Sequence, residues 1–204
     1  SVVAATALLA VVIVPSAVAN GTPTGLWETS QLPTCIADGT APCGVSDGGG
    51  VELGVKFTTS QPIYVVGVRF YRADTGTFSG SLWDANGTFI TRADDSTSGA
   101  GWQTVLFATR VAMGTSDTFV ASYYAPSGGY AFDWYYFTSG GYTTGPVTAL
   151  GGTDVNGVFT YGPSSTFPTS VFQDTNYWVT PLWVPQDTEG PITSDVVATP
   201  NPVA

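Results

Sequence analysis

Turn-forming residues divide the middle of this 204-residue chain into short extended runs, and this division limits the fold more than any other feature. The chain has 25 glycines and 14 prolines. The runs between them are rich in Val, Thr, Phe, Tyr and Trp, which suit a pleated, half-buried surface. Nothing within residues 51–184 shows the 3.6-residue period of a helix. The pattern predicts an all-β fold, an antiparallel β-sandwich of jelly-roll type.

Two of these runs predict particular places in a sheet. Residues 51–58 alternate strictly, with an apolar face opposite a polar face that includes Glu52. This alternation indicates a half-buried antiparallel strand. Residues 63–72 carry apolar groups on both faces, which predicts a central strand.

Two turn signals add to this picture. Asn86-Gly87 lies between two strand-like runs and predicts a hairpin, because both residues tolerate the positive φ of a type I′ turn. The last run, residues 175–184, contains Pro181, which cannot donate to a ladder. We therefore expect this strand to be an edge strand or to carry a bulge.

The stretch 118–137 carries nine aromatic side chains and predicts a strand, a Pro/Gly turn and a second strand. Tyr and Trp offer a flat apolar face with a polar tip, which suits the C–H face and hydroxyls of a sugar ring. A purely structural aromatic cluster is the alternative interpretation. The candidate ligand-binding residues in and after this stretch are Tyr124, Tyr130, Trp134, Tyr135 and Tyr142.

The charge of the chain excludes one class of partner. The formal net charge is −10, with one lysine and four arginines. Such a chain has no basic patch that could release counterions from a polyanion, so we expect neither nucleic acid nor an anionic membrane as a partner. The charge is compatible with a neutral polymer or a cation as the partner.

The absence of histidine removes several kinds of active site. Ser-His-Asp and Cys-His nucleophile systems and His-containing zinc sites all need this residue. No motif indicates the facing carboxylates of a glycosidase. The sequence therefore predicts a protein that is not an enzyme, without catalytic residues, metal ligands or cofactor.

The two cysteines, Cys35 and Cys43, lie in a segment rich in Pro, Gly and Asp. Two thiols cannot complete a four-ligand structural zinc site. We predict a disulfide that closes a small loop in an oxidising compartment, and reduced cysteines without a structural role are the alternative.

Several acids fall in or beside predicted turns. A turn that brings two carboxylates together with backbone carbonyls suits a structural calcium ion. Solvated turn acids are the other interpretation. The acids concerned are Asp74, Asp84, Asp94, Asp95 and Asp133.

The two ends of the chain differ in composition from the middle. Residues 1–19 resemble part of a secretory signal peptide, with an apolar run and Ala17-Val18-Ala19 before a mature start at Asn20. An anchoring N-terminal helix is the alternative. Residues 20–50 form an N-terminal extension, 51–184 the sandwich domain, and 185–204 a Pro/Thr-rich linker that enters a predicted immunoglobulin-like repeat. We expect a secreted, extracellular protein whose mature domain does not insert into a membrane.

Six blocks of the sequence follow one another in a characteristic order: residues 51–57, 67–71, 80–83, 101–107, 120–128 and 175–179. Together they resemble the domain-of-unknown-function family 4082. The resemblance runs from about Trp27 to Val184. It implies a bacterial extracellular β-sandwich module, commonly joined to immunoglobulin-like repeats, and no established activity.

Individual positions within these blocks carry further expectations. The family often has histidines at the positions of Phe78 and Gly129, which this chain lacks. Trp83, Trp102 and Trp178 lie at strand positions in the blocks, and we expect them to be buried.

Two functional hypotheses follow from the sequence. The first is a secreted, non-catalytic accessory module that binds a polysaccharide or cell-surface polymer through exposed aromatic side chains. The second is a structural spacer or adhesin domain of a multi-domain surface protein, with no small ligand.

Overall fold

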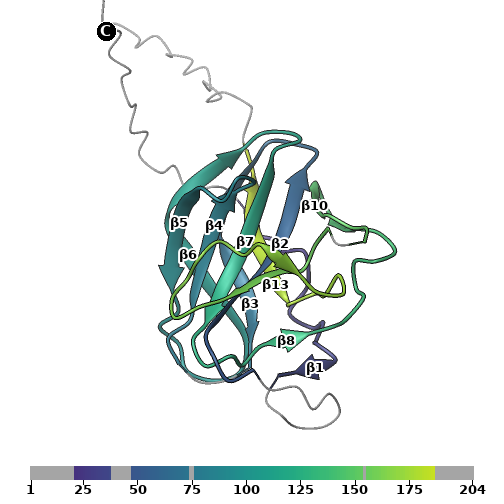
Figure 1. Ribbon diagram of the computed structural model, residues 1–204. Coiled ribbons are helices and arrows are strands. Elements are labelled where there is room, and N and C mark those ends of the chain that lie inside the picture. Colours follow the sequence, from purple (N-terminus) through teal and green to yellow (C-terminus); the bar gives the residue numbers. More distant parts are fainter. Residues whose placement is uncertain (1–20, 38–46, 74–75, 154, 187–204) are drawn as a thin grey trace, which may run out of the picture.

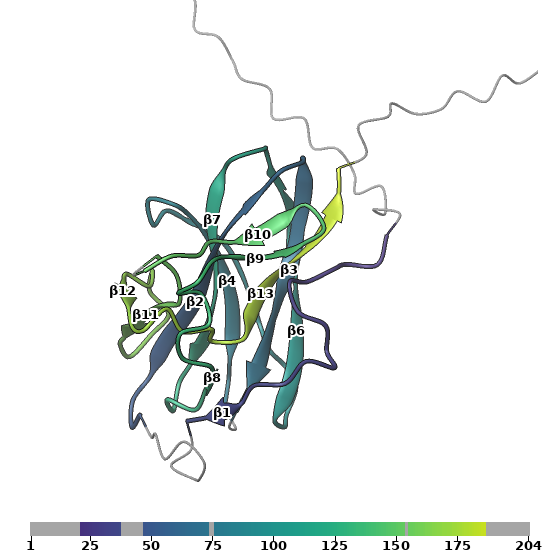
Figure 2. The same cartoon turned by 90° about the vertical axis from the view of Figure 1, so that its right-hand side faces the viewer.

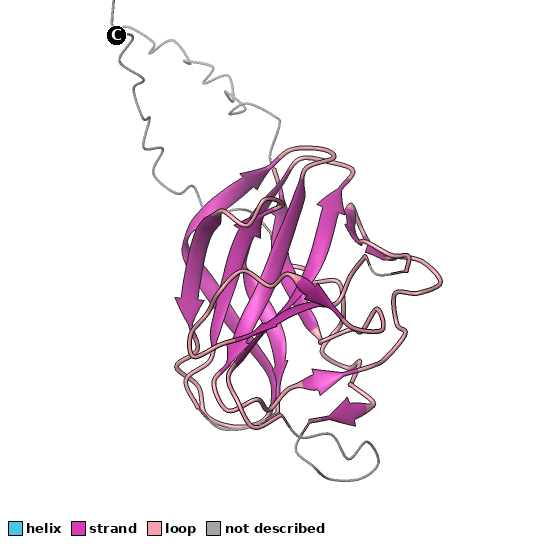
Figure 3. Ribbon diagram, viewed as in Figure 1, coloured by secondary structure: helices cyan, strands magenta, loops and turns pink. Residues whose placement is uncertain are grey.

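The computed structural model describes residues 21–37, 47–73, 76–153 and 155–186. These residues form strands, turns and loops, and none of them belongs to a helix that could span a membrane (Figure 3). The predicted signal segment 1–19, Asn20 and most of the predicted linker 185–204 lie outside the described residues.

The strands form two main sheets and one short ladder, all antiparallel (Figure 1). The larger sheet has the order β12 (Ser170–Val171), β11 (Val158–Tyr161), β2 (Val51–Thr59), β7 (Thr118–Ala125), β4 (Ser79–Asp84) and β5 (Phe89–Asp94), with β10 (Val147–Ala149) paired to β2 and to β9 (Tyr142–Thr144). The smaller sheet has the order β13 (Val179–Pro185), β3 (Ile63–Arg72) and β6 (Gly101–Met113). The short ladder joins β1 (Cys35–Ile36) to β8 (Ala131–Phe132) at one end of the molecule.

The two main sheets pack face to face, which confirms the predicted all-β sandwich. Figure 2 shows the layers side-on, with β3, β6 and β13 on one side and β2, β4 and β7 on the other. Phe57, Ile63, Phe70 and Leu82 come from both sheets and are completely buried between them. Burial of such side chains is the main favourable term in the stability of the sandwich.

The predicted inward face of β2 is confirmed, but the prediction for Glu52 on its other face is wrong. Val51 and Phe57 are buried as the alternation requires, and Glu52 is buried as well, with no exposed surface. Residues 162–171 cover this outer face of the larger sheet: Phe167 packs against Trp83, and Tyr124 donates a hydrogen bond to the Gly162 carbonyl. The sheet therefore has protein on both faces at this point.

The predictions for the second and last runs are confirmed. β3 is the central strand of the smaller sheet, and its register shifts between Val65 and Gly67. A Cβ atom at Gly67 would lie 2.2 Å from the Val105 carbonyl oxygen, so the strands can approach there only because the residue is glycine. β13 is an edge strand, and its register shifts just after Pro181, between Leu182 and Trp183.

The predicted hairpin joins β4 to β5, although its turn is not of type I′. Gly87 has a positive φ of 87°, whereas Asn86 is not among the described residues with positive φ. The Asp84 carboxylate accepts hydrogen bonds from the backbone N–H groups of Asn86 and Thr88. This hydrogen bonding lowers the pKa of the exposed Asp84 carboxyl.

The second strand predicted within residues 118–137 forms, but it is short. β7 forms as predicted, but the second strand is limited to β8, which pairs with β1 and not with β7. Tyr135 has a φ of 59°, and its N–H donates to the Gln173 carbonyl. The chain therefore turns after Trp134, toward the segment that precedes β13.

Cys35 lies in β1 and is largely buried. Its predicted disulfide partner, Cys43, lies outside the described residues. The pairing of these two cysteines stays a prediction.

Candidate ligand-binding pocket

A pocket of about 310 Å³ opens where the β1–β8 end of the sandwich meets β2 and β11. Its volume lies at the low end of the range for small-molecule sites, so it suits one compact group. We call it the aromatic pocket. Its lining residues are Asp47, Val51, Leu53, Tyr130, Phe132, Trp134, Phe159, Tyr161, Phe172 and Tyr177.

Strand alternation places the first group of rings. Phe132 lies in β8, with Tyr130 two residues before it and Trp134 two residues after it, so strand alternation points the three side chains the same way. Phe132 is 1% exposed and Tyr130 8%, whereas Trp134 at the rim is 43% exposed. The prediction that Tyr130 is exposed is therefore wrong, since it lies within the pocket wall.

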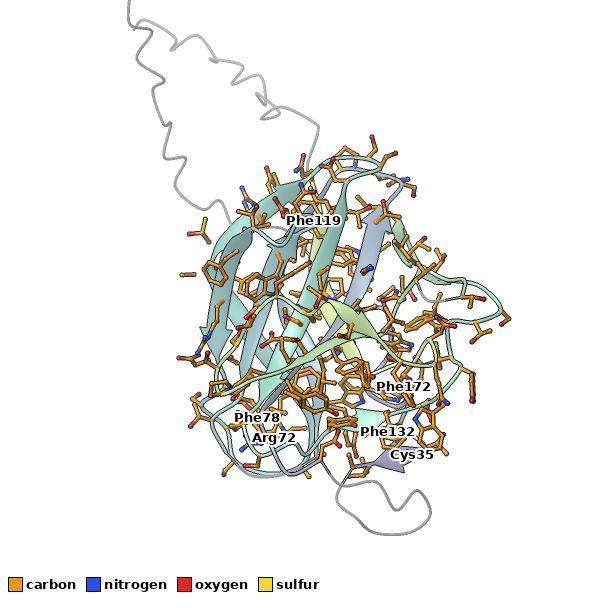
Figure 4. All side chains as sticks on the ribbon, in the orientation of Figure 1. Cys35, Arg72, Phe78, Phe119, Phe132 and Phe172 are labelled. Carbon is orange, nitrogen blue, oxygen red and sulfur yellow. The ribbon has the colours of Figure 1, made fainter. Side chains whose placement is uncertain are left out.

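The inner face of the larger sheet supplies the opposite wall. Phe159 lies opposite Leu53 and Tyr161 opposite Val51 in the register between β11 and β2. Such directly opposed residues project to the same face of a sheet. Tyr161 and Phe172 join Trp134 as strongly exposed rim residues, and Figure 4 shows Phe172 near Phe132 on the same side of the molecule.

Several of the rings that line the pocket pack edge to face against one another, at steep angles between their planes. The planes of Tyr130 and Tyr177 meet at 80° with centroids 5.7 Å apart. Phe159 meets Tyr161 at 74° and Tyr177 at 68°. Edge-to-face contacts of this kind fix the rings relative to one another. A group that enters the pocket therefore meets aromatic surface on several sides.

Among the described residues, Asp47 is the one charged residue that lines the aromatic pocket. Its Oδ2 atom accepts hydrogen bonds from the hydroxyls of Tyr130 and Tyr161, each at 2.7 Å. Burial and this carboxylate raise the pKa of Tyr161 to about 12 and raise that of Tyr130 further. Burial also raises the pKa of Tyr177. The hydroxyls therefore stay protonated at neutral pH.

No basic side chain neutralises Asp47. All basic residues of the chain, Lys56, Arg69, Arg72, Arg92 and Arg110, belong to the described ranges. The ion pairs within those ranges join Arg72 to Asp95 and Arg92 to Asp94. The pocket therefore combines aromatic walls with a carboxylate that has no basic partner there.

The other three candidate residues lie away from this pocket. Tyr124 is on β7 and bonds to the segment that covers the outer face. Tyr135 is 59% exposed in the turn after Trp134. Tyr142 stacks on Trp27 with centroids 5.8 Å apart and planes at 20°. Sequence alternation thus located Tyr130 and Trp134 together, and missed the residues that distant segments contribute.

The tryptophans in the blocks that resemble the family pack inside the protein or against its core. Trp83 and Trp178 are buried as predicted, and Trp102 is half-buried. Their indole N–H groups donate to Ser122, Asp133 and the Gln31 carbonyl. Each ring is therefore fixed by a hydrogen bond at its polar edge.

The acids considered for calcium bind protein donors. Asp84 caps the hairpin, Asp94 pairs with Arg92 and Asp95 with Arg72. Asp133 accepts hydrogen bonds from Trp178 and from the Thr34 backbone. Asp74 lies outside the described residues, and within them no cluster of three or more Asp, Glu, Cys or His side chains could hold a metal ion.

The two positions at which the resemblance implied histidine in other family members, Phe78 and Gly129, are both buried in this chain. Phe78 is completely buried, stacks on Phe70 and lies 4.7 Å from the Arg72 guanidinium. Gly129 is buried in the turn just before Tyr130. In this chain a stacked phenylalanine ring occupies the first position and a buried turn glycine occupies the second.

A family model described as domain of unknown function (DUF4082) matches residues 37–179. No curated protein matches the chain.

Proposed function

The chain belongs to the DUF4082 family, whose domain has no known function. We propose that the chain is a secreted, non-catalytic module that binds a polysaccharide or surface polymer through the aromatic pocket. The observation that carries the proposal is the combination of exposed and buried rings around one opening. Trp134, Tyr161 and Phe172 are 43–57% exposed at the rim, above the buried Tyr130 and Tyr177.

The chemistry of the lining supports binding over catalysis. Exposed aromatic faces can stack on the apolar faces of sugar rings, and the tyrosine hydroxyls and Asp47 supply polar contacts. Hydrolysis of a glycosidic bond would need a second carboxylate facing Asp47 at a suitable distance. No second acid is among the described residues that line the pocket.

The net charge of −10 fits the same proposal. It disfavours polyanions and leaves neutral or cationic polymers as partners. A structural spacer without a ligand is the outcome that the following experiment would favour if no polymer bound.

Trp134→Ala is expected to weaken polymer binding by about tenfold to a hundredfold, because the substitution removes a large exposed ring from the rim. The measurement is a pull-down with insoluble polysaccharides together with a glycan array. The control is Tyr135→Ala, which removes the neighbouring exposed ring outside the pocket and should leave binding within about twofold. Thermal unfolding checks that both variants fold. Equal losses in the two variants, or no binding of the wild type to any polymer, would contradict the proposal.

A further inference from the structure

The composition of the aromatic pocket narrows the class of ligand, and this step rests on the proposed polymer-binding function. Of the described residues that line it, seven are aromatic, two are aliphatic, and one is the acid Asp47. A neutral sugar usually needs several hydrogen-bond donors and acceptors around its ring. This pocket offers few, and two of its tyrosine hydroxyls already bond to Asp47.

The arrangement of the rings favours a positive charge. The face of an aromatic ring carries negative charge density and attracts a cation within about 6 Å of its centroid. Tyr130 and Phe159 come from different walls of the pocket, and Tyr177 contacts both rings, so a group in the pocket lies near several rings at once.

Asp47 supplies a negative charge that attracts a positively charged ligand. It lies in the wall of the pocket, and no lysine or arginine of the described ranges pairs with it. A cationic group in the pocket would thus supply the ion pair that the described residues do not. The low polarity of the surrounding rings strengthens that attraction.

The position of the acceptors decides which kind of cation fits. The hydroxyls of Tyr130 and Tyr161 both lie 2.7 Å from the Asp47 Oδ2 atom, so the oxygens of these three residues gather on one side of the pocket. A primary ammonium has three N–H donors that point in different directions and lose their water on entry, and each donor left unpaired on the apolar side is costly. A quaternary ammonium has no N–H group, so it gains the attraction of the rings without this cost. We propose that the aromatic pocket binds a quaternary ammonium substituent carried by the polymer ligand.

The test is a titration of the 204-residue chain with choline and with 3,3-dimethylbutan-1-ol, which has the same shape but carbon in place of the charged nitrogen. Tryptophan fluorescence and calorimetry report binding. Choline is expected to bind about tenfold more tightly than the neutral isostere. Equal affinities, or no detectable binding of choline, would overturn the proposal.

Two variants separate the role of Asp47 from the overall charge. Asp47→Asn keeps groups that can hydrogen-bond to Tyr130 and Tyr161, and it should remove most of the preference for choline. Asp117→Asn removes the same charge from an exposed turn on another part of the protein, and it should keep the preference. An unchanged preference in Asp47→Asn, with its fold intact by thermal unfolding, would contradict the assignment.

Further experimental outcomes separate the ammonium assignment from the proposed polymer binding. If a polymer binds at the pocket but choline does not displace it, the polymer proposal stands and the ammonium assignment fails. If choline binds but no polymer does, the assignment stands and the polymer proposal fails. Co-sedimentation with phosphatidylcholine vesicles that choline blocks would support the ammonium group while contradicting a polymer as its source.

Discussion

Replacing Asp95 by asparagine is expected to lower the free energy of unfolding by about 3–5 kcal/mol. Asp95 and Arg72 form an ion pair of 3.0 Å whose side chains are 1% and 2% exposed. Asparagine at this position would leave the guanidinium charge buried without its carboxylate. The carbonyl oxygens of Gly76 and Thr97 and the ring of Phe78 also contact Arg72.

The matched control is Asp94→Asn, one residue earlier in the chain. Asp94 pairs with Arg92 at 3.2 Å, with side chains 66% and 44% exposed. A solvent-exposed pair contributes about 0–1 kcal/mol, so this variant should be nearly neutral. Urea unfolding of both variants at pH 7 measures the difference. Similar small losses in the two variants would show that the buried pair does not hold this end of the sandwich together.

Replacing Glu52 by glutamine is expected to stabilise the protein above pH 7 and to leave its stability little changed at pH 4. Burial raises the pKa of the Glu52 carboxyl from 4.5 to about 7, and the hydrogen bond from Ser122, at 2.5 Å, offsets only part of that effect. Ser122 in turn accepts a hydrogen bond from the Trp83 indole. The carboxyl therefore stays protonated in the folded protein at pH values where the unfolded chain has lost this proton.

The direction of the pH dependence follows from proton linkage. Between about pH 4.5 and pH 7 the folded state binds more protons at Glu52 than the unfolded state, so the free energy of unfolding falls as the pH rises. The total cost above pH 7 is about 3 kcal/mol. Glutamine cannot ionise and removes this dependence.

Urea unfolding of wild type and Glu52→Gln from pH 4 to pH 8.5 tests this expectation. Glu28→Gln serves as the control, because Glu28 is exposed and the substitution is chemically identical. The control should follow the wild-type curve. Parallel curves for Glu52→Gln and wild type would mean that the carboxyl is ionised throughout this range.

Local patterns were sufficient to predict the class of fold and several of its details. The alternation in residues 51–57 found the core face of β2, and Pro181 marked an edge strand with a bulge. These signals are local because each reflects the backbone or one face of one strand. The burial of Glu52 was missed because residues 162–171, distant in sequence, cover it.

The candidate site was predictable only in part, for the same reason. The two-residue spacing of Tyr130 and Trp134 is a local signal, and both residues line the pocket. Asp47, Phe159 and Phe172 arrive there through strand pairing and turns that no single run specifies. The alternation of Phe159 and Tyr161 was the one further local signal, since it places both rings on one face of a short strand.

Both proposals place the ligand in the aromatic pocket beside Trp134. The most direct test is the ¹H–¹⁵N spectrum of the indole N–H groups during titration with choline or with a polymer found in the pull-down. We predict that the Trp134 signal shifts progressively, whereas the signals of Trp27 and Trp83, whose indoles bond to Tyr136 and Ser122 in the interior, stay in place. A ligand that binds while the Trp134 signal remains unchanged would contradict the account.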